Sequence, residues 1–166
     1  MKKYIDCDGV VFDSEIWLFD DEYRSLKIKD EPSKIKYIQA KDWDKILKKS
    51  EVINDAINIL KELRDFAILT KVHSMENEGV AKIKLFRSLD IKNEIILVPY
   101  TLQKTDVVDP LGNILVDDTI HNLDDWAHLG GIPIYFNKDN LDMDGWGKVN
   151  SKYPKIKSLD CLRYIK

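Results

Sequence analysis

The sequence predicts an α/β domain in which a doubly wound parallel sheet of five strands carries helices on both faces, with a small helical insertion after the first strand. Short apolar runs alternate with amphipathic helical segments, which is the pattern of β-α-β units. Three of these runs end in polar residues, at Asp6, Thr70 and Asp117. The carboxyl ends of parallel strands form the ligand-binding edge of such sheets. Residues 15–49 are rich in lysine and show only helical spacing, which predicts the insertion.

The five expected strands are short and apolar, as strands buried on both faces of a sheet are. They span residues 3–5, 66–69, 95–98, 113–116 and 132–136. Pro99 stops the third strand, because proline cannot donate a backbone hydrogen bond to a sheet. The connections between these strands are expected to be right-handed.

The expected helices carry apolar residues at three- and four-residue spacing. The first runs over residues 15–26. In the lysine-rich stretch 27–49, Pro32 is expected to break helical structure and to leave one further helical piece around Trp43. The remaining helices are expected over residues 52–63, 80–86, 122–129 and 159–165, and Gly130 closes the third of these.

Composition and charge narrow the class of protein. The chain has 166 residues, enough for one core and a small insertion. Its formal net charge of −3 gives no reason to expect binding to a nucleic-acid polymer. No apolar run is as long as a membrane span, and charged residues interrupt the N-terminal stretch, so we expect neither a membrane protein nor a signal peptide. We therefore expect a cytoplasmic protein in which Cys7 and Cys161 are reduced thiols, with a disulfide between them as the minor alternative.

Two pairs of carboxylates stand at expected strand ends. Asp6 and Asp8 follow the first strand, and Asp117 and Asp118 follow the fourth. Unpaired carboxylates at one edge would repel each other and raise each other's pKa, and a hard cation with oxygen ligands, usually Mg²⁺, relieves this. Alternatively, such aspartates cap turns or helices. One pair alone would leave both interpretations open, but two pairs with Thr70 between them favour the metal site.

These residues resemble motifs of the haloacid dehalogenase-like hydrolases. Residues 4–14, YIDCDGVVFDS, look like the first motif, and Leu69-Thr70 is similar to the second. Residues 114–118, ILVDD, are similar to the acidic fourth motif, and Lys104 falls where the family keeps the lysine of its third. The resemblance implies a Rossmann-like core formed by residues 1–14 and 50–166, with residues 15–49 as a small helical cap.

The resemblance also implies roles in a magnesium-dependent phosphatase. Asp6 would be the nucleophile that takes the phosphoryl group, and Asp8 would be the general acid and then the base. Mg²⁺ would be held by Asp6, by the backbone carbonyl of Asp8 and by Asp118 directly, with Asp117 bound through water.

The same motifs imply two groups that bind the phosphate. Thr70 would donate a hydrogen bond to a phosphate oxygen, and Lys104 would neutralise its charge. Lys71, directly after Thr70, is the competitor for the role of Lys104. Lys82 and Lys84 lie in the middle of an expected helix and are poorer candidates.

The likeness within the superfamily is greatest to the 5′(3′)-deoxyribonucleotidases, which implies a nucleoside monophosphate as substrate. Trp17 and Trp43 in the expected cap could stack on a base, although such aromatics more often pack the core of the cap itself. Lys71 and His121 are further candidates for substrate contact. The alternatives are a phosphatase for a sugar phosphate or another small metabolite, and a non-catalytic phosphate-binding relative.

Two features are not expected to take part in the chemistry. By strand alternation Cys7 should point away from the pocket into the core. Residues 142–145 repeat the Asp-x-Asp-Gly pattern, and read from Asn140 they resemble the start of a calcium loop. No apolar strand precedes them, and the twelfth position would be Ser151 where such a loop needs glutamate, so we predict neither a second active site nor a calcium site there.

Overall fold

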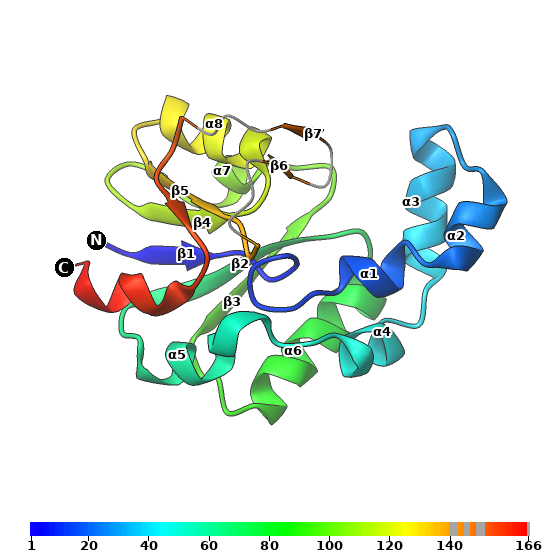
Figure 1. Cartoon of the computed structure of the whole chain (residues 1–166), viewed down its shortest axis with the longest axis horizontal. Helices are drawn as coiled ribbons and strands as arrows, with labels where there is room; N and C mark the ends of the chain where they lie inside the picture. The colour runs from blue at the N-terminus through cyan, green and yellow to red at the C-terminus, as the bar shows by residue number, and fades with distance from the viewer. Residues whose placement is uncertain (140–142, 145–146, 149–151, 166) are drawn as a thin grey trace.

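The computed structural model describes residues 1–139, 143–144, 147–148 and 152–165, and it has the predicted α/β fold (Figure 1). Its main sheet has the strand order β3-β2-β1-β4-β5-β8, and every neighbouring pair is parallel. The strands are β1 (Lys3–Ile5), β2 (Phe66–Val72), β3 (Glu94–Pro99), β4 (Ile114–Asp117), β5 (Ile132–Phe136) and β8 (Lys155–Ile156). All five expected strands are confirmed, and β8 makes the sheet six-stranded.

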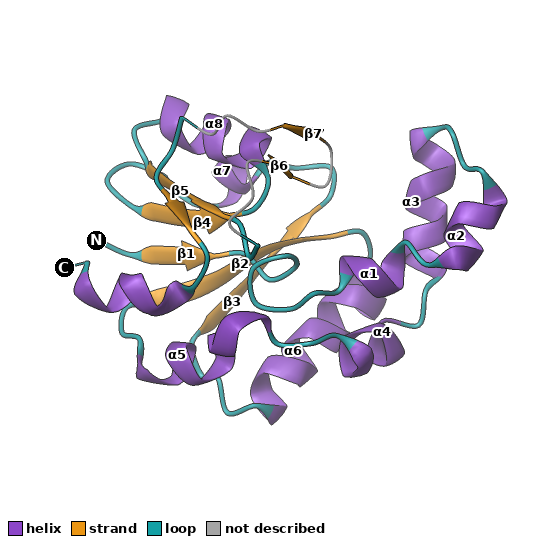
Figure 2. Ribbon diagram, viewed as in Figure 1, coloured by secondary structure: helices purple, strands orange, loops and turns teal. Residues whose placement is uncertain are grey.

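Helices lie on both faces of this sheet (Figure 2). Beyond the insertion they are α5 (Ala56–Glu62), α6 (Val80–Ser88), α7 (Lys104–Val107) and α8 (Ile120–His128), together with the 3₁₀ turns η1 (Ile53–Asp55) and η3 (Leu159–Tyr164) and the π-helical turn η2 (Met75–Gly79). β6 (Met143–Asp144) and β7 (Gly147–Lys148) pair with each other in antiparallel orientation, separately from the main sheet. α5, α6 and η3 cover one face, and α7 and α8 cover the other.

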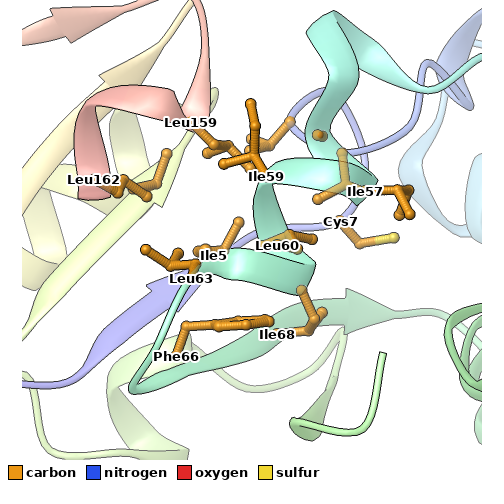
Figure 3. Close-up of a cluster of buried hydrophobic side chains, with 14 of the residues drawn as sticks. Ile5, Cys7, Ile57, Ile59, Leu60, Leu63, Phe66, Ile68, Leu159 and Leu162 are labelled. Carbon is orange, nitrogen blue, oxygen red and sulfur yellow. The ribbon is translucent and has the colours of Figure 1, made fainter. Parts of the chain in front are cut away.

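Side chains of β1 alternate between two apolar cores. Ile5 is fully buried beneath α5 and η3, whereas Tyr4 points to the opposite face and packs edge-on against Trp126 of α8. Figure 3 shows the first core, where Leu60 of α5 lies over Ile5 and Cys7. Cys7 is thus a buried core residue, as expected. Both Cys7 and Cys161 are free thiols.

Residues 15–49 contain helices and no strands, but these helices differ from those expected. They are α1 (Glu15–Leu18), α2 (Asp21–Leu26), α3 (Glu31–Ala40) and α4 (Trp43–Lys49). The single helix expected over 15–26 breaks at Phe19, because the Asp20 carboxylate accepts a hydrogen bond from the backbone N–H of Tyr23 at 3.1 Å and starts a new helix. Pro32 does not break helical structure. It lies in the first turn of α3, where its missing N–H has no helical acceptor to lose.

A third apolar cluster joins residues 15–49 to α6. Leu18, Ile38, Trp43 and Leu47 pack together with Ala81 of α6. Helices α2 and α3 project away from the sheet, whereas α4 lies along α6 (Figure 1).

The part of the chain that the structure describes contains no helix long and apolar enough to cross a membrane. In the second Asp-x-Asp-Gly segment, residues 142 and 145 lie outside the described residues, as do Asn140 and Ser151. The prediction that no calcium binds there therefore stays a prediction.

Candidate active site

The strand register brings the candidate residues to one edge of the sheet. Ile5, the last residue of β1, is paired with Ile68 of β2 on one side and with Val116 of β4 on the other. Asp6 directly follows Ile5, Asp117 directly follows Val116, and Thr70 lies two positions beyond Ile68 on β2. The register therefore brings Asp6 to the same edge of the sheet as Thr70 on one side and Asp117 on the other.

Three carboxylates gather at this edge. Asp6, Asp117 and Asp118 each place one oxygen within 4.8 Å of the other two, and we call them the carboxylate trio. Gly9 makes room for it. Its φ of +71° lies in the left-handed region, and a Cβ there would stand 2.0 Å from Oδ2 of Asp118.

A buried lysine lies against two members of the trio. Nζ of Lys104 is 2.9 Å from Oδ1 of Asp6 and 2.6 Å from Oδ2 of Asp117. Lys104 is the first residue of α7, and a reciprocal capping pair between Gln103 and Asp106 fixes the start of that helix. Between the two lysine candidates, the structure therefore brings Lys104 rather than Lys71 to the carboxylates.

The trio remains short of positive charge despite Lys104. Burial raises the pKa of Asp6 to about 7, and the neighbouring charges of Asp117 and Asp8 add to this while Lys104 opposes it. Burial, together with the neighbouring charges of Asp117, Asp6 and Glu15, raises the pKa of Asp118 well above its usual value. Three hard oxygen donors gathered at one point are suited to Mg²⁺, so the residues present fit the metal that the sequence predicts.

Asp8 is held apart from the trio. Its Oδ1 accepts a hydrogen bond from Oγ of Ser14 at 2.5 Å, and its Oδ2 accepts one from Nζ of Lys82 at 2.5 Å. Burial alone would raise the pKa of Asp8, but the Lys82 ammonium and the two hydrogen bonds outweigh it and hold this pKa below its usual value. Asp6 and Asp8 are two residues apart and yet have pKa values shifted in opposite directions.

Lys82 is the main site residue that the sequence interpretation missed. Although it lies within α6, its side chain is completely buried. Its Nζ contacts Glu78 at 2.7 Å and Thr70 at 3.1 Å as well as Asp8. A signal was present in the sequence, because Glu78, Lys82 and Phe86 follow one another at four-residue spacing and therefore share one face of a helix.

Thr70 and Lys71 have different partners from those of Lys104. Thr70 is completely buried, and its hydroxyl accepts from Lys82 and donates to the backbone carbonyl of Lys71 at 3.3 Å. Nζ of Lys71 donates to Oε1 of Gln103 at 2.8 Å. Burial and the nearby charge of Lys104 lower the pKa of Lys71.

A cavity of about 400 Å³ opens onto these residues from beneath the insertion. Its lining includes Asp6, Asp8, Phe19, Lys34, Trp43, Lys71, His73, Lys104 and His121. The structure therefore brings Trp43, Lys71 and His121 to the cavity, but it does not bring Trp17 there. Trp17 is 39% exposed, and Nζ of Lys49 lies 5.2 Å from its ring centre. Trp43 is 2% exposed, so it offers little open ring surface.

Comparisons with known proteins find similarity in structure only. No protein-family model matches the sequence, and no curated protein is similar to it. A haloacid dehalogenase-superfamily hydrolase of subfamily IA from Geobacter sulfurreducens has a TM-score of 0.62 at 14% identity, with 100% of both chains covered. A phosphonoacetaldehyde hydrolase-like protein from Oleispira antarctica has a TM-score of 0.65 at 12% identity, over 99% of this chain and 90% of the other.

A third solved structure has the same fold. It is the D,D-heptose 1,7-bisphosphate phosphatase from B. bronchiseptica in complex with magnesium and phosphate, with a TM-score of 0.58 at 13% identity, over 99% of this chain and 97% of the other. The structural neighbours are haloacid dehalogenase-superfamily hydrolases. The chain therefore has the Rossmann-like fold of this superfamily, as predicted.

Proposed function

We propose that this chain, folded like the haloacid dehalogenase-superfamily hydrolases, is a Mg²⁺-dependent phosphatase that hydrolyses a small phosphomonoester through an aspartyl-phosphate intermediate. The observation that carries the proposal is that Asp6 and Asp8 have different surroundings. Asp6 belongs to the carboxylate trio, whereas Asp8 is held outside it by Ser14 and Lys82. This difference supports Asp6 as the carboxylate for metal and phosphoryl chemistry and Asp8 as the one that moves a proton.

In the first step, an Asp6 carboxylate oxygen attacks phosphorus, and the bond from phosphorus to the ester oxygen breaks. Protonated Asp8 gives its proton to that oxygen, so that the alcohol leaves and Asp6 carries the phosphoryl group. The pKa of Asp8 is low in the free protein. The negative charge of a bound phosphate would raise it, which favours the acid form when the acid is needed.

In the second step, Asp8 acts as a base. It takes a proton from a water molecule while the water oxygen attacks phosphorus. The bond between phosphorus and Asp6 breaks, which releases inorganic phosphate and restores the Asp6 carboxylate. Asp8 has regained its proton and is ready for the next ester.

The other site residues would hold the phosphate and the metal. Mg²⁺ bound by Asp6, Asp118 and the Asp8 carbonyl, with Asp117 through water, would act as a Lewis acid toward the phosphoryl oxygens. Lys104, already 2.9 Å from Asp6, would neutralise charge on the transferring group. The Thr70 hydroxyl would donate to a phosphate oxygen.

We propose a nucleoside monophosphate as substrate on the likeness of the sequence to the 5′(3′)-deoxyribonucleotidases. The cavity volume of about 400 Å³ lies in the range of small-ligand sites. A sugar phosphate is the second candidate, and the burial of Trp43 favours it, because the cavity then offers a base little stacking surface.

The direct test is phosphate release from a panel of nucleotides and sugar phosphates with Mg²⁺, before and after EDTA. We expect metal-dependent turnover. Asp6→Asn should lower it on the order of a thousandfold or more, because the nucleophile is lost. Turnover that survives EDTA or the Asp6→Asn substitution would rule out the proposed mechanism, and equal rates on both ester classes would reject the nucleotide preference.

A further inference from the structure

Besides Lys104, a second lysine of the site is buried, and it contacts Asp8 rather than Asp6. The Lys82 side chain is completely buried and comes within 2.5 Å of Asp8, 2.7 Å of Glu78 and 3.1 Å of Thr70. It also donates to the backbone carbonyl of Lys71 at 3.2 Å. A buried ammonium must be paired with negative charge and hydrogen-bond acceptors, and Lys82 has both.

Glu78 fixes Lys82 in place. Its side chain is 2% exposed. Oε1 accepts from Lys82, while Oε2 accepts from the backbone N–H of His73 at 2.7 Å. The carboxylate is thus held from both sides. Because Glu78 alone already neutralises Lys82, the additional contact with Asp8 is not needed to satisfy the buried lysine.

The turn that carries Glu78 is firmly anchored. Glu78 lies in the π-helical turn η2, a local widening that is frequent at functional sites. Gly79 in this turn lies against β3, where a Cβ would stand 2.7 Å from Cδ1 of Leu97. The Asn77 side chain donates to the backbone carbonyls of Gln39 and Lys41 at 3.1 and 2.8 Å, which fastens the same turn to the insertion.

Lys82 and Lys104, the buried lysines of the site, contact different catalytic candidates. Lys104 binds Asp6 together with Asp117, and Lys82 binds Asp8. We propose that Lys82, braced by Glu78, is a positioning residue that fixes the Asp8 carboxylate for proton transfer and keeps it apart from the carboxylate trio. The inference rests on the proposed phosphatase function, since it assigns the residue that orients its acid–base group.

The test uses the full-length double variant Lys82→Met/Glu78→Gln, which removes both charges so that neither is left buried and unpaired. The matched control is Lys84→Met, two positions along the same helix, where the side chain is exposed. Both variants are compared with the wild type on p-nitrophenyl phosphate and on an alkyl phosphate ester. The p-nitrophenolate released from the first is a good leaving group that needs little protonation, whereas the alkoxide released from the second needs a proton from the general acid.

For the double variant we expect a burst of p-nitrophenolate at nearly the wild-type rate, followed by steady-state turnover lowered roughly a hundredfold, because the base of the second step is misplaced. With the alkyl ester we expect the first phase, in which the alcohol is released, to slow by about a hundredfold as well. A purely structural role would slow both esters and both phases alike. Uniform slowing, or wild-type rates with both esters, overturns the proposal.

A crystal structure of the double variant separates this inference from the proposed function. We expect the Asp8 carboxylate to leave its position between Ser14 and residue 82. An unchanged Asp8 overturns the positioning role whether or not the protein is a phosphatase. Absence of phosphate release by the wild type from every ester rejects the proposed function, while the crystal structure still decides the position of Asp8.

Discussion

Gly9 and Gly112 have nearly the same left-handed backbone, with φ of +71° and +68°, but only Gly9 lies against a carboxylate. A Cβ at Gly9 would stand 2.0 Å from Asp118, whereas one at Gly112 would meet nothing within 4 Å. We expect Gly9→Ala to displace Asp118 and to weaken Mg²⁺ binding by about tenfold or more, in addition to a backbone cost of roughly 1–2 kcal/mol. Calorimetric titration with Mg²⁺ measures the affinity.

Gly112→Ala is the control for that substitution, because it carries the backbone cost without the clash. It should lower the unfolding free energy by a similar amount while leaving Mg²⁺ affinity unchanged. If both variants bind Mg²⁺ like the wild type, Asp118 does not serve as a ligand in the way we propose.

At the level of single residues, strand ends were easier to predict than the buried faces of helices. Asp6, Thr70 and Asp117 follow strands whose apolar runs are evident in the sequence, so their meeting follows from the fold class. The position of Lys82 depends instead on the rotation of α6 about its axis, which decides that this lysine faces inward while Lys84 faces solvent. Mid-helix lysines are usually solvated, and that expectation failed here.

Among the elements, the helices of the insertion show how local hydrogen bonds override periodicity. Ile16, Phe19, Tyr23 and Leu26 have the spacing of one helix, yet the Asp20 cap divides them between α1 and α2. An aspartate inside an amphipathic pattern can be a cap or an exposed side chain, and the sequence alone does not distinguish these. Pro32 was ambiguous in the same way, because a proline can break a helix or begin one.

The two tryptophans of the insertion belong to different environments, and their substitutions should differ accordingly. Trp43 is 2% exposed in the cluster that joins α4 to α6, and its indole N–H donates to the backbone carbonyl of Ile38 at 3.1 Å. We expect Trp43→Ala to lower the unfolding free energy by about 3–5 kcal/mol and to slow every substrate. Chemical denaturation and kcat/KM for a nucleotide and p-nitrophenyl phosphate measure the two effects.

Trp17 is exposed and does not line the cavity, so Trp17→Ala should change stability by no more than about 0.5 kcal/mol. The ratio of kcat/KM for the two substrates should stay at its wild-type value. A selective loss of nucleotide turnover in Trp17→Ala would contradict this and would mean that the insertion moves over the cavity when substrate binds.

For the whole molecule, the alternation of strands and helices was enough to predict a parallel sheet covered on both faces. The sixth strand was not predictable, because β8 has only two residues and follows a long polar segment. It is held to β5 by backbone bonds, among them the N–H of Asn137 to the carbonyl of Ile156 at 2.8 Å. Such a strand forms because the edge of the neighbouring strand β5 has unpaired backbone N–H and C=O groups. The two residues of β8 give no sign of this in their own sequence.

The stabilisation of the whole molecule by Mg²⁺ should depend on pH, because Mg²⁺ competes with a proton on Asp6. Because burial raises the pKa of Asp6 to about 7, the metal-free folded protein keeps a proton there that the unfolded chain loses near its usual carboxyl pKa. Between about pH 4 and pH 7 the contribution of Asp6 to stability therefore falls as the pH rises. Mg²⁺ must displace this proton, so its stabilising effect should grow through the same window and level off above about pH 7.

The measurement is the melting temperature with and without saturating Mg²⁺ at about pH 5.5 and about pH 8. We expect a clearly larger rise at the higher pH. Asp6→Asn should reduce this difference but not abolish it, since the pKa of Asp118 is raised as well. An equal rise at both pH values would show that Mg²⁺ does not compete with protons for these carboxylates. The trio would then not be the metal site, because any ion bound by Asp6 must first take the place of its proton.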